Sequence, residues 1–331
     1  MLLIQKSWVV FVYATTISVE SIIIEFLVTL LHIPPILIAA LSITLGGILL
    51  LLVKKLVIDR IGDKRSIKKK ELPLFSILNK NLLYASLSLS IGVFTWYDSI
   101  ARVGASKEVL LAGPLEVTLI VILARIFLKE RLSKIHVTGI VVAVTGFLIA
   151  IISDTGTISP AMMTNSTPIV TFGDIEAIIS ALGFALGVLF LTKLLLKHSA
   201  LEVAGASLLI SGIILIGILL LIYFIYEVSF IYVASNENTL NVFAILMLFS
   251  ILPFIGALSY TVGISRIGPG LTGTIGASGI LITLFCQIAL NELGIMSGNL
   301  PINIPLAVLG SVCGFLGVAI IHVRDGIQIS A

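Results

Sequence analysis

Charged side chains are scarce in this chain, and so is the polar surface that a soluble protein needs. Asp, Glu, Lys and Arg make up 11% of its 331 residues, whereas hydrophobic residues make up 58%. A soluble domain usually carries about 25% charged residues. The mean hydropathy of +1.20 fits the same imbalance. Because so few charges cannot cover a surface that faces water, the sequence predicts an integral membrane protein.

Cysteine is also rare, and the common catalytic motifs are missing. Cys286 and Cys313 both fall inside apolar runs, which excludes a disulfide framework and a cysteine-rich metal site. The histidines are scattered without an H-E-x-x-H pattern, and the sequence has neither a G-x-S-x-G elbow nor a P-loop. We therefore expect no enzyme activity, no cofactor and no ATP-driven pumping. An ion channel is disfavoured because no loop resembles a selectivity filter.

Long apolar runs are what the sequence has instead. A helix that crosses a bilayer needs about 20 such residues. Runs such as 208–226 show no alternation of polar and apolar residues, which argues against the short strands of a membrane barrel and favours helices. The ten runs of sufficient length are 8–31, 35–53, 80–101, 108–128, 134–153, 174–196, 200–226, 242–265, 270–290 and 304–323.

Lys and Arg residues predict the orientation of these helices. The segment 54–80 is strongly basic, and assigning it to the cytoplasm places 18 of the 20 Lys and Arg residues on that side. Arg102 and Lys107 are the exceptions. By the positive-inside rule, the sequence predicts a multi-pass protein of the cell membrane with both termini in the cytoplasm. The basic segment is explained by its role in orienting the protein in the membrane. The net charge of +3 therefore indicates no nucleic-acid partner.

An internal repeat divides the chain into two halves. The corresponding positions are Leu119 and Leu281, Arg125 and Gln287, Glu130 and Glu292, and the segments 101–104 and 265–268. Five runs per half is an odd number, so the second half is expected to be inverted relative to the first. We therefore predict repeats at 1–153 and 174–331, joined by an external linker at 154–173. Inverted repeats of this kind place a binding site between them near the middle of the membrane.

The stretch from Ser99 to Ala150 contains Ala-Arg-x-Gly-Ala-Ser, an apolar run, Lys-Glu-Arg-Leu and a glycine-bearing run. This pattern resembles the EamA domain, the repeat unit of the drug/metabolite transporter superfamily, and Gly173-Asp174 is similar to the start of a second such repeat. The resemblance implies ten transmembrane helices in two EamA repeats, with the fifth helix of each repeat peripheral and the other helices around a central cavity. It also implies export or exchange of small metabolites. The chain departs from the family pattern at Glu116-Val117 and Ser278-Gly279, where a proline is often the second residue.

Two opposite charges interrupt the run at 108–128. Glu116 and Arg125 are nine residues apart, which places them on opposite faces of a helix and about 13 Å apart along its axis, too far for a salt bridge. Arg125 lies one turn before Lys129, so its long side chain can extend to the interface. Glu116 follows Pro114, which we expect to kink the helix. Its short side chain cannot reach bulk water, so it either faces a cavity or hydrogen bonds to a neighbouring helix.

The run at 8–31 carries two further carboxylates. Tyr13, Thr16 and Glu20 form one polar stripe at helical spacing. Glu25 lies about 140° from Glu20 around the helix, so only one of the two can point straight into a cavity. Glu20 is the deeper residue and the stronger candidate. Glu25 is expected to pack against a helix or to lie toward the external interface.

Aromatic and acidic residues lie together near the end of the run at 80–101. Trp96 is either an interfacial aromatic residue or part of the cavity, and Asp98 is spaced to pair with Arg102. Tyr260 has the place of Trp96 in the second repeat. Aromatic rings beside carboxylates suit an organic cation or a zwitterion. The candidate substrate residues are Thr16, Glu20, Trp96, Tyr97, Asp98, Glu116, Tyr260, Ser278 and Gln287.

Three other motifs are interpreted without a role in substrate binding. Asp174 and Glu176 open a run, where acidic groups favour the helix dipole. The pairs Gly183/Gly187 and Gly310/Gly314 have GxxxG spacing, which favours close packing within the bundle over dimerisation. Asn165-Ser166-Thr167 matches a glycosylation acceptor.

These features predict a secondary transporter that moves a small organic metabolite, either amino acid-like, an amine or a related compound, by alternating access and in the export direction. Its expected partners are the substrate and the lipid bilayer, with proton coupling open and with either a monomer or a homodimer as the assembly. The sharper hypothesis is that Glu20 and Glu116 face the cavity, and that at least one of them recognises substrate or exchanges a proton. The alternative is a membrane scaffold or receptor, in which polar side chains enclosed by a repeat would have no evident use.

Overall fold

The fold is seen in a computed structural model, which describes residues 2–58, 77–128, 134–153, 171–226, 239–295 and 300–322. All regular structure in these ranges is helical. The helices are α1 (Leu2–Thr29), α2 (Pro35–Val53), η1 (Lys54–Ile58), α4 (Lys80–Val103), α5 (Ala105–Leu128), α6 (Lys134–Ser153), α7 (Phe172–Leu195), α8 (Ala200–Tyr226), α10 (Thr239–Phe249), α11 (Ile251–Ile267), α12 (Pro269–Gly276), α13 (Gly279–Glu292) and α14 (Ile304–His322).

Every apolar run found in the sequence coincides with a helix or with two helices end to end. The runs at 242–265 and 270–290 are each divided in two, as α10 with α11 and α12 with α13. Within the described ranges, six segments are long and apolar enough to cross a membrane: Trp8–Thr29, Pro35–Leu56, Phe172–Leu195, Ala200–Ile225, Asn241–Ile267 and Pro269–Glu292. The predicted all-helical membrane architecture is confirmed, whereas ten crossings remain a prediction.

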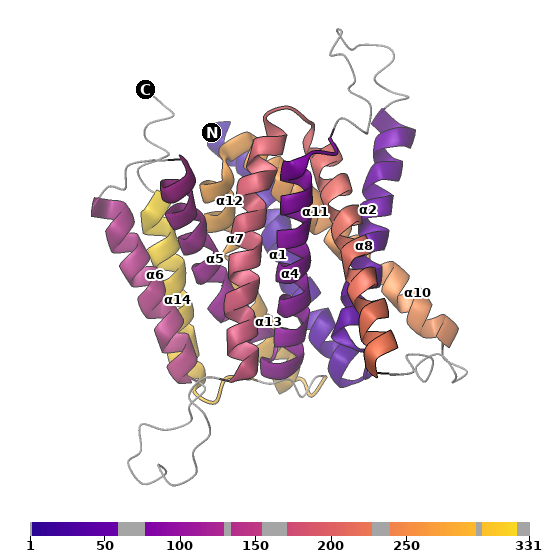
Figure 1. Cartoon of the computed structure of the whole chain (residues 1–331). Helices are drawn as coiled ribbons and strands as arrows, with labels where there is room; N and C mark the ends of the chain where they lie inside the picture. Colours follow the sequence, from indigo (N-terminus) through magenta and orange to yellow (C-terminus); the bar gives the residue numbers. More distant parts are fainter. Residues whose placement is uncertain are drawn as a thin grey trace.

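The helices run up and down through one bundle (Figure 1). The marked N-terminus, the end of α2 and the start of α4 lie at the upper end in this view, and α14 ends there as well. The junction of α4 with α5 and the start of α7 lie at the lower end. Successive helices thus alternate in direction, as the predicted topology requires.

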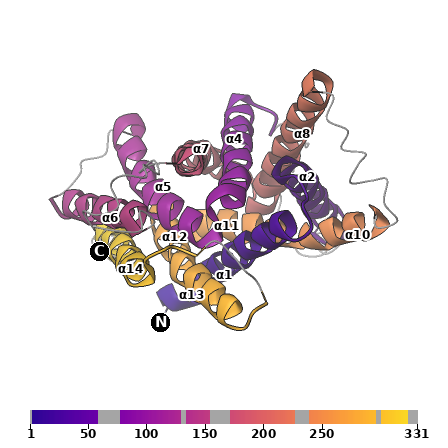
Figure 2. The ribbon, with the colours of Figure 1, turned by 90° about the horizontal axis from the view of Figure 1, so that it is seen from below.

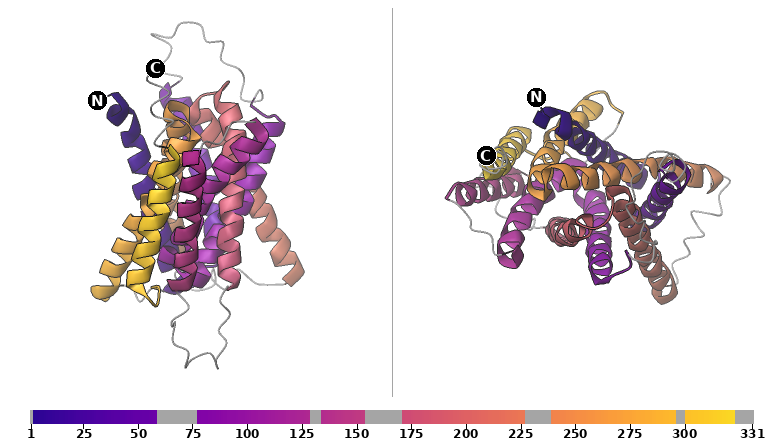
Figure 3. Two further views of the ribbon diagram at one scale, coloured as in Figure 1. Left: turned by 90° about the vertical axis from the view of Figure 1, so that its left-hand side faces the viewer. Right: turned by 90° about the horizontal axis from the view of Figure 1, so that it is seen from above.

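Packing pairs define the centre and the edges of the bundle. Helix α4 packs on α7, α1 on α11, and α2 on α8. Helices α6 and α14 pack closely on each other at one edge, away from α2 and α8 at the other (Figure 2). Helices α10 and α11 cross the bundle obliquely (Figure 3).

Small residues permit the closest of these contacts. A methyl group on Gly183 of α7 would lie 2.7 Å from the backbone nitrogen of Gly92 in α4. A methyl group on Gly146 of α6 would likewise meet the backbone of Gly310 and Gly314 in α14. The expectation that the GxxxG pairs serve packing within the bundle is confirmed at these contacts.

Two single glycines join consecutive helices at opposite ends of the bundle. Gly104 links α4 to α5 with φ of 87°, and Gly268 links α11 to α12 with φ of 85°. Such angles are accessible to glycine but strained for other residues. Each glycine donates its backbone N–H to the carbonyl four residues earlier, at Ile100 and Ile264, and so ends the preceding helix.

Helix α5 is continuous through Pro114, whereas its expected counterpart in the second half is interrupted between α12 and α13. Ser18 of α1 donates a 3.0 Å hydrogen bond to the carbonyl oxygen of Gly279 at this interruption. The ring of Tyr13 fills the space beside Gly276, the last residue of α12. The break in the second half is therefore packed directly against α1.

Several expectations fall on positions outside the described residues. These are most of the basic segment 54–80, the side chain of Arg125, the Lys129-Glu130-Arg131 sequence, and Asn165 in the linker 154–173.

Candidate functional site

A carboxyl group in the middle of the bundle belongs to Glu20 of α1. Its Oε1 atom accepts a 2.8 Å hydrogen bond from the hydroxyl of Tyr97 in α4, and that hydroxyl lies 3.4 Å from Ser42 Oγ in α2. Glu20 and Tyr97 are both buried. Helix α11 also approaches the site: a methyl group added to Gly256 would lie 3.7 Å from the Thr16 side chain and 3.9 Å from the second carboxylate oxygen of Glu20. Four helices therefore enclose this carboxyl group.

A second carboxyl group, that of half-buried Glu116 in α5, has an equivalent partner in the other half of the chain. Glu116 Oε1 accepts a 3.1 Å hydrogen bond from the hydroxyl of Tyr260 in α11. The ring of Tyr260 in turn lies against the ring of Tyr13, with 4.5 Å between the ring centroids. Tyr13 lies near enough to Glu20 and Glu116 for the charges of both to act on it.

A third carboxyl group, that of Glu108 in α5, is almost completely buried. Glu108 Oε1 accepts a 3.4 Å hydrogen bond from the hydroxyl of Ser180 in α7, and the indole of Trp96 in α4 also donates to the carboxyl group. Glu108 feels the negative charge of Glu116 on the same helix. Trp96 packs edge-on against the rings of Tyr97 and Phe184. It therefore lies in the core of the bundle and not at its lipid interface.

We call these three groups the carboxyl cluster (Glu20, Glu108 and Glu116). Among the ion pairs of the described residues, none involves a member of the cluster. Their donors are hydroxyl and indole groups. Because a buried charge is costly unless a cation or several hydrogen bonds compensate it, the cluster favours binding of cations.

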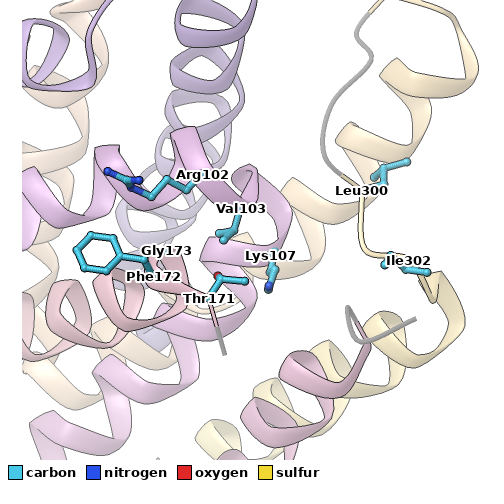
Figure 4. A pocket seen from close by; sticks show the side chains of 8 residues that line it. All are labelled: Arg102, Val103, Lys107, Thr171, Phe172, Gly173, Leu300 and Ile302. Carbon is cyan, nitrogen blue, oxygen red and sulfur yellow. The ribbon is translucent and has the colours of Figure 1, made fainter. Parts of the chain in front are cut away.

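The lower end of the bundle carries a pocket of about 510 Å³ (Figure 4). Arg102 and Lys107 line it together with residues from the start of α7 and from the segment before α14. Arg102 forms ion pairs with Asp98 at 2.8 Å and with Glu176 at 3.1 Å. The expected pairing of Arg102 with Asp98 is confirmed.

Lys107 forms a buried ion pair with Asp174 at the start of α7, with 2.9 Å between Nζ and Oδ1. Asp174 also completes a capping box: its Oδ2 accepts from the Thr171 N–H at 2.7 Å, and Thr171 Oγ1 accepts from the Asp174 N–H. The capping role expected for Asp174 is thus confirmed, and the ion pair with Lys107 is additional. Together they fix the α4–α5 junction to the beginning of α7.

The amide groups at the start of α5 are satisfied by side chains from distant helices. Glu25 Oε2 accepts from the Ala105 N–H at 2.9 Å and from Gln287 Nε2 at 2.6 Å, and Gln287 Oε1 accepts from the Ser106 N–H at 2.8 Å. The first amides of a helix have no partner within that helix. Glu25 and Gln287 therefore cap α5 from α1 and α13, which agrees with the expectation that Glu25 packs against a helix.

The structure brings together only some of the candidate residues. Glu20, Thr16, Trp96, Tyr97, Glu116 and Tyr260 lie around the carboxyl cluster. Asp98 lies at the end of α4 with Arg102, Gln287 caps α5, and Ser278 donates to the carbonyl of Ile275 at the break before α13.

The sequence reasoning missed Glu108, Ser42 and Ser180. The spacing of Glu108 could have indicated its role. Glu108, Ala112 and Glu116 are spaced four residues apart, so the two carboxylates lie along one stripe of a helix. Serines in apolar helices carry no such signal, since most of them bond to their own backbone.

Comparison with known proteins identifies the architecture. Residues 6–152 match the model of the EamA-like transporter family. The first half of the chain is an EamA-like transporter domain. The resemblance seen in the sequence is confirmed for this half of the chain, whose match is to a family of membrane transporters.

A solved structure described only as "Crystal structure of protein" aligns with this EamA-like chain over 93% of its length and 98% of the other chain, with a TM-score of 0.57 and 18% sequence identity. At this identity the likeness shows a shared fold. It includes both halves of the chain, whereas the family match is confined to the first. The search of curated proteins gives no match.

Proposed function

We propose that this protein, whose first half is EamA-like, is a secondary transporter that exports a small amine-bearing or cationic metabolite, and that Glu20 and Glu116 of the carboxyl cluster form its substrate site. The observation that carries the proposal is the juxtaposition of Glu20 and Glu116 around Tyr13, each carboxyl group bonded to a tyrosine hydroxyl and neither to a basic side chain among the described residues. An ammonium group compensates buried carboxylates, and aromatic faces attract the same charge.

Alternating access about this site is supported by the pairing of helices. Helix α4 packs on α7 as α11 packs on α1. Likewise, α4 packs on α8 as α11 packs on α2. These are the pairs expected if the second half, 174–331, repeats the first, 1–153, in inverted orientation. The proposed function includes this relation, with the lower end of Figure 1 external and both termini cytoplasmic.

The proposal is tested by counterflow in proteoliposomes against a panel of amino acids, polyamines and nucleosides. Wild-type protein should exchange one or more amine-bearing compounds and no neutral nucleoside. Glu20→Gln and Glu116→Gln keep the shape and remove the charge, so each should weaken the apparent affinity for the amine at least tenfold. The matched control is Asp98→Asn, which alters a carboxyl group outside the cluster and should transport normally.

Failure of the proposal has two forms. Inactivity of the wild type across the whole panel would favour the scaffold or receptor alternative. Unchanged rate and affinity in both glutamine variants, at normal membrane levels, would make the two carboxyl groups structural and move the search to other residues.

A further inference from the structure

Glu108 differs in its compensation from Asp174 and Glu25, two other acidic residues that are almost completely buried. Asp174 is paired with Lys107 at 2.9 Å, and Glu25 accepts from a backbone amide at 2.9 Å and a side-chain amide at 2.6 Å. Glu108 has 1% of its surface exposed, and its donors are the Ser180 hydroxyl at 3.4 Å and the Trp96 indole. An ionised carboxylate is poorly stabilised by such partners in a low-dielectric interior.

The position of Glu108 links the pocket to the carboxyl cluster. The preceding residue, Lys107, lines the 510 Å³ pocket at the lower end of the bundle (Figure 4). Glu116 follows eight residues later on the same stripe of α5, about 12 Å further along the helix axis. Glu108 therefore lies between an opening to water and the group that we assign to substrate.

Charged and polar groups on α1, α4, α5, α7 and α13 define the surroundings of Glu108. On α5 itself the negative charge of Glu116 acts on Glu108. Helix α4 contributes the neutral Trp96, and α7 contributes Ser180 together with Asp174, whose charge is balanced by Lys107. From α1 and α13, Glu25 and Gln287 are directed to the first amides of α5.

We propose that Glu108 is the proton-binding residue of the transport cycle, taking up its proton from water in the pocket lined by Arg102 and Lys107. This inference rests on the proposed function, in which Glu20 and Glu116 bind the substrate cation. A cation bound at Glu116 removes the repulsion that an ionised Glu108 would experience. When the site faces the cytoplasm and the cation binds, the Glu108 O–H bond breaks and the proton passes to water on that side. The carboxylate remains until the cation has left to the external side, and a proton from water in the pocket then forms the O–H bond again. One proton thus moves in exchange for one positive charge of substrate.

The experiment separates proton coupling from substrate binding in the same proteoliposomes. The probes are radiolabelled spermidine and lysine, a polyamine and an amino acid from the panel, and two processes are measured: substrate counterflow without a pH gradient, and accumulation driven by a pH gradient. In the wild type both should occur. Glu108→Gln cannot release a proton, so counterflow should stay within about twofold of wild type while gradient-driven accumulation falls to the level of empty liposomes.

A second variant guards against a folding defect in the first. Ser180→Ala removes a hydrogen bond that stabilises the ionised form of Glu108 but leaves its carboxyl group in place. Gradient-driven accumulation should persist, with its pH profile shifted toward higher pH by up to about one unit. A control, Ser90→Ala, removes a buried serine hydroxyl of α4 that bonds to the backbone at Ser86, and should leave the profile unchanged.

The outcomes are distinguishable. Wild-type counterflow with gradient-driven accumulation intact in Glu108→Gln overturns the role of Glu108 and leaves the proposed function standing. Loss of counterflow and accumulation together in a stable Glu108→Gln protein makes Glu108 part of substrate binding, and a pH profile unmoved by Ser180→Ala also contradicts the inference. Wild-type counterflow without any response to a pH gradient overturns proton exchange itself, and no wild-type counterflow with either probe overturns both proposals for these compounds.

Discussion

Gly104 and Gly268 adopt nearly the same backbone conformation, with φ and ψ of 87° and 158° at Gly104 and of 85° and 161° at Gly268. Each ends one helix and begins the next, and the two lie at opposite ends of the bundle. The sequence segments around them, 101–104 and 265–268, already correspond in the internal repeat. Two equivalent hinges of opposite orientation are what an inverted repeat would produce.

Replacement of Gly104 by alanine should destabilise the protein. A side chain at this φ costs about 1–3 kcal/mol, since L-residues rarely adopt the conformation. The matched control is Gly217→Ala in α8, where an added methyl group meets nothing within 4 Å. That change should be neutral or stabilising by up to about 1 kcal/mol. Unfolding of the purified protein in detergent measures both, and equal stability of the two variants would contradict the prediction.

Removal of the cap on α5 should depend on the chemistry of the replacement. Glu25→Gln keeps a carbonyl oxygen that can accept from the Ala105 N–H, so stability should change little. Glu25→Ala leaves that amide without its acceptor and should cost about 0.5–2 kcal/mol or more, as loss of a helix cap does. Because Gln287 bonds to the same carboxyl group, the costs of Glu25→Ala and Gln287→Ala should not add in a double-mutant cycle. Additive costs would show that the two caps act independently.

The buried ion pair of Lys107 with Asp174 should be sensitive to loss of one partner only. Lys107→Met leaves Asp174 charged and buried, with an expected cost of about 3–5 kcal/mol. The double variant Lys107→Met/Asp174→Asn should recover much of this loss, because asparagine is neutral and can still accept at the Thr171 cap. Asp98→Asn, which breaks a more exposed pair, should cost at most about 1 kcal/mol. These stabilities are measured by thermal unfolding, and a double variant as unstable as Lys107→Met would refute the explanation.

Labelling of single cysteines should define the orientation. Cys286 and Cys313 are replaced first, and a cysteine is then placed at Asn79 or at Ile302, which are exposed at opposite ends of the bundle. A membrane-impermeant reagent applied to intact cells should label the cysteine at position 302 and should reach position 79 only after the cells are opened. The reverse pattern would mean that the basic segment 54–80 is external.

Local interactions were the part of the site that the sequence allowed us to predict. The pair of Asp98 with Arg102 spans four residues, and the Asp174 cap spans three, so helical periodicity alone specifies them. Glu20 and Glu116 were found because carboxyl groups are costly in lipid wherever they lie. No such rule identifies the partner of a group on another helix. Tyr97 was a candidate, yet its bond to Glu20 joins residues 77 positions apart.

Gln287 shows the same difference between what a local sequence pattern indicates and what packing between helices decides. Its polarity within an apolar run made it a candidate for the substrate site, but the structure directs it to Glu25 and to the start of α5. The deciding factor is the need of the first helical amides for acceptors, which the amides of Ala105 and Ser106 find on α1 and α13. Which polar residue caps a helix and which faces a ligand therefore depends on how the helices are packed.

The sequence by itself determined that the chain enters a membrane, which stretches of it are helical, and the likeness of its first half to EamA domains. These properties follow from composition, from the length of apolar runs and from local motifs, which act over a few turns of helix. Only the tertiary structure decided that Glu20 meets Tyr97, that Glu116 meets Tyr260, and that Glu108 belongs to the same cluster. The physical reason is that hydrophobicity drives every apolar helix into lipid without selecting its neighbours, whereas close packing at glycines and the few buried hydrogen bonds select them.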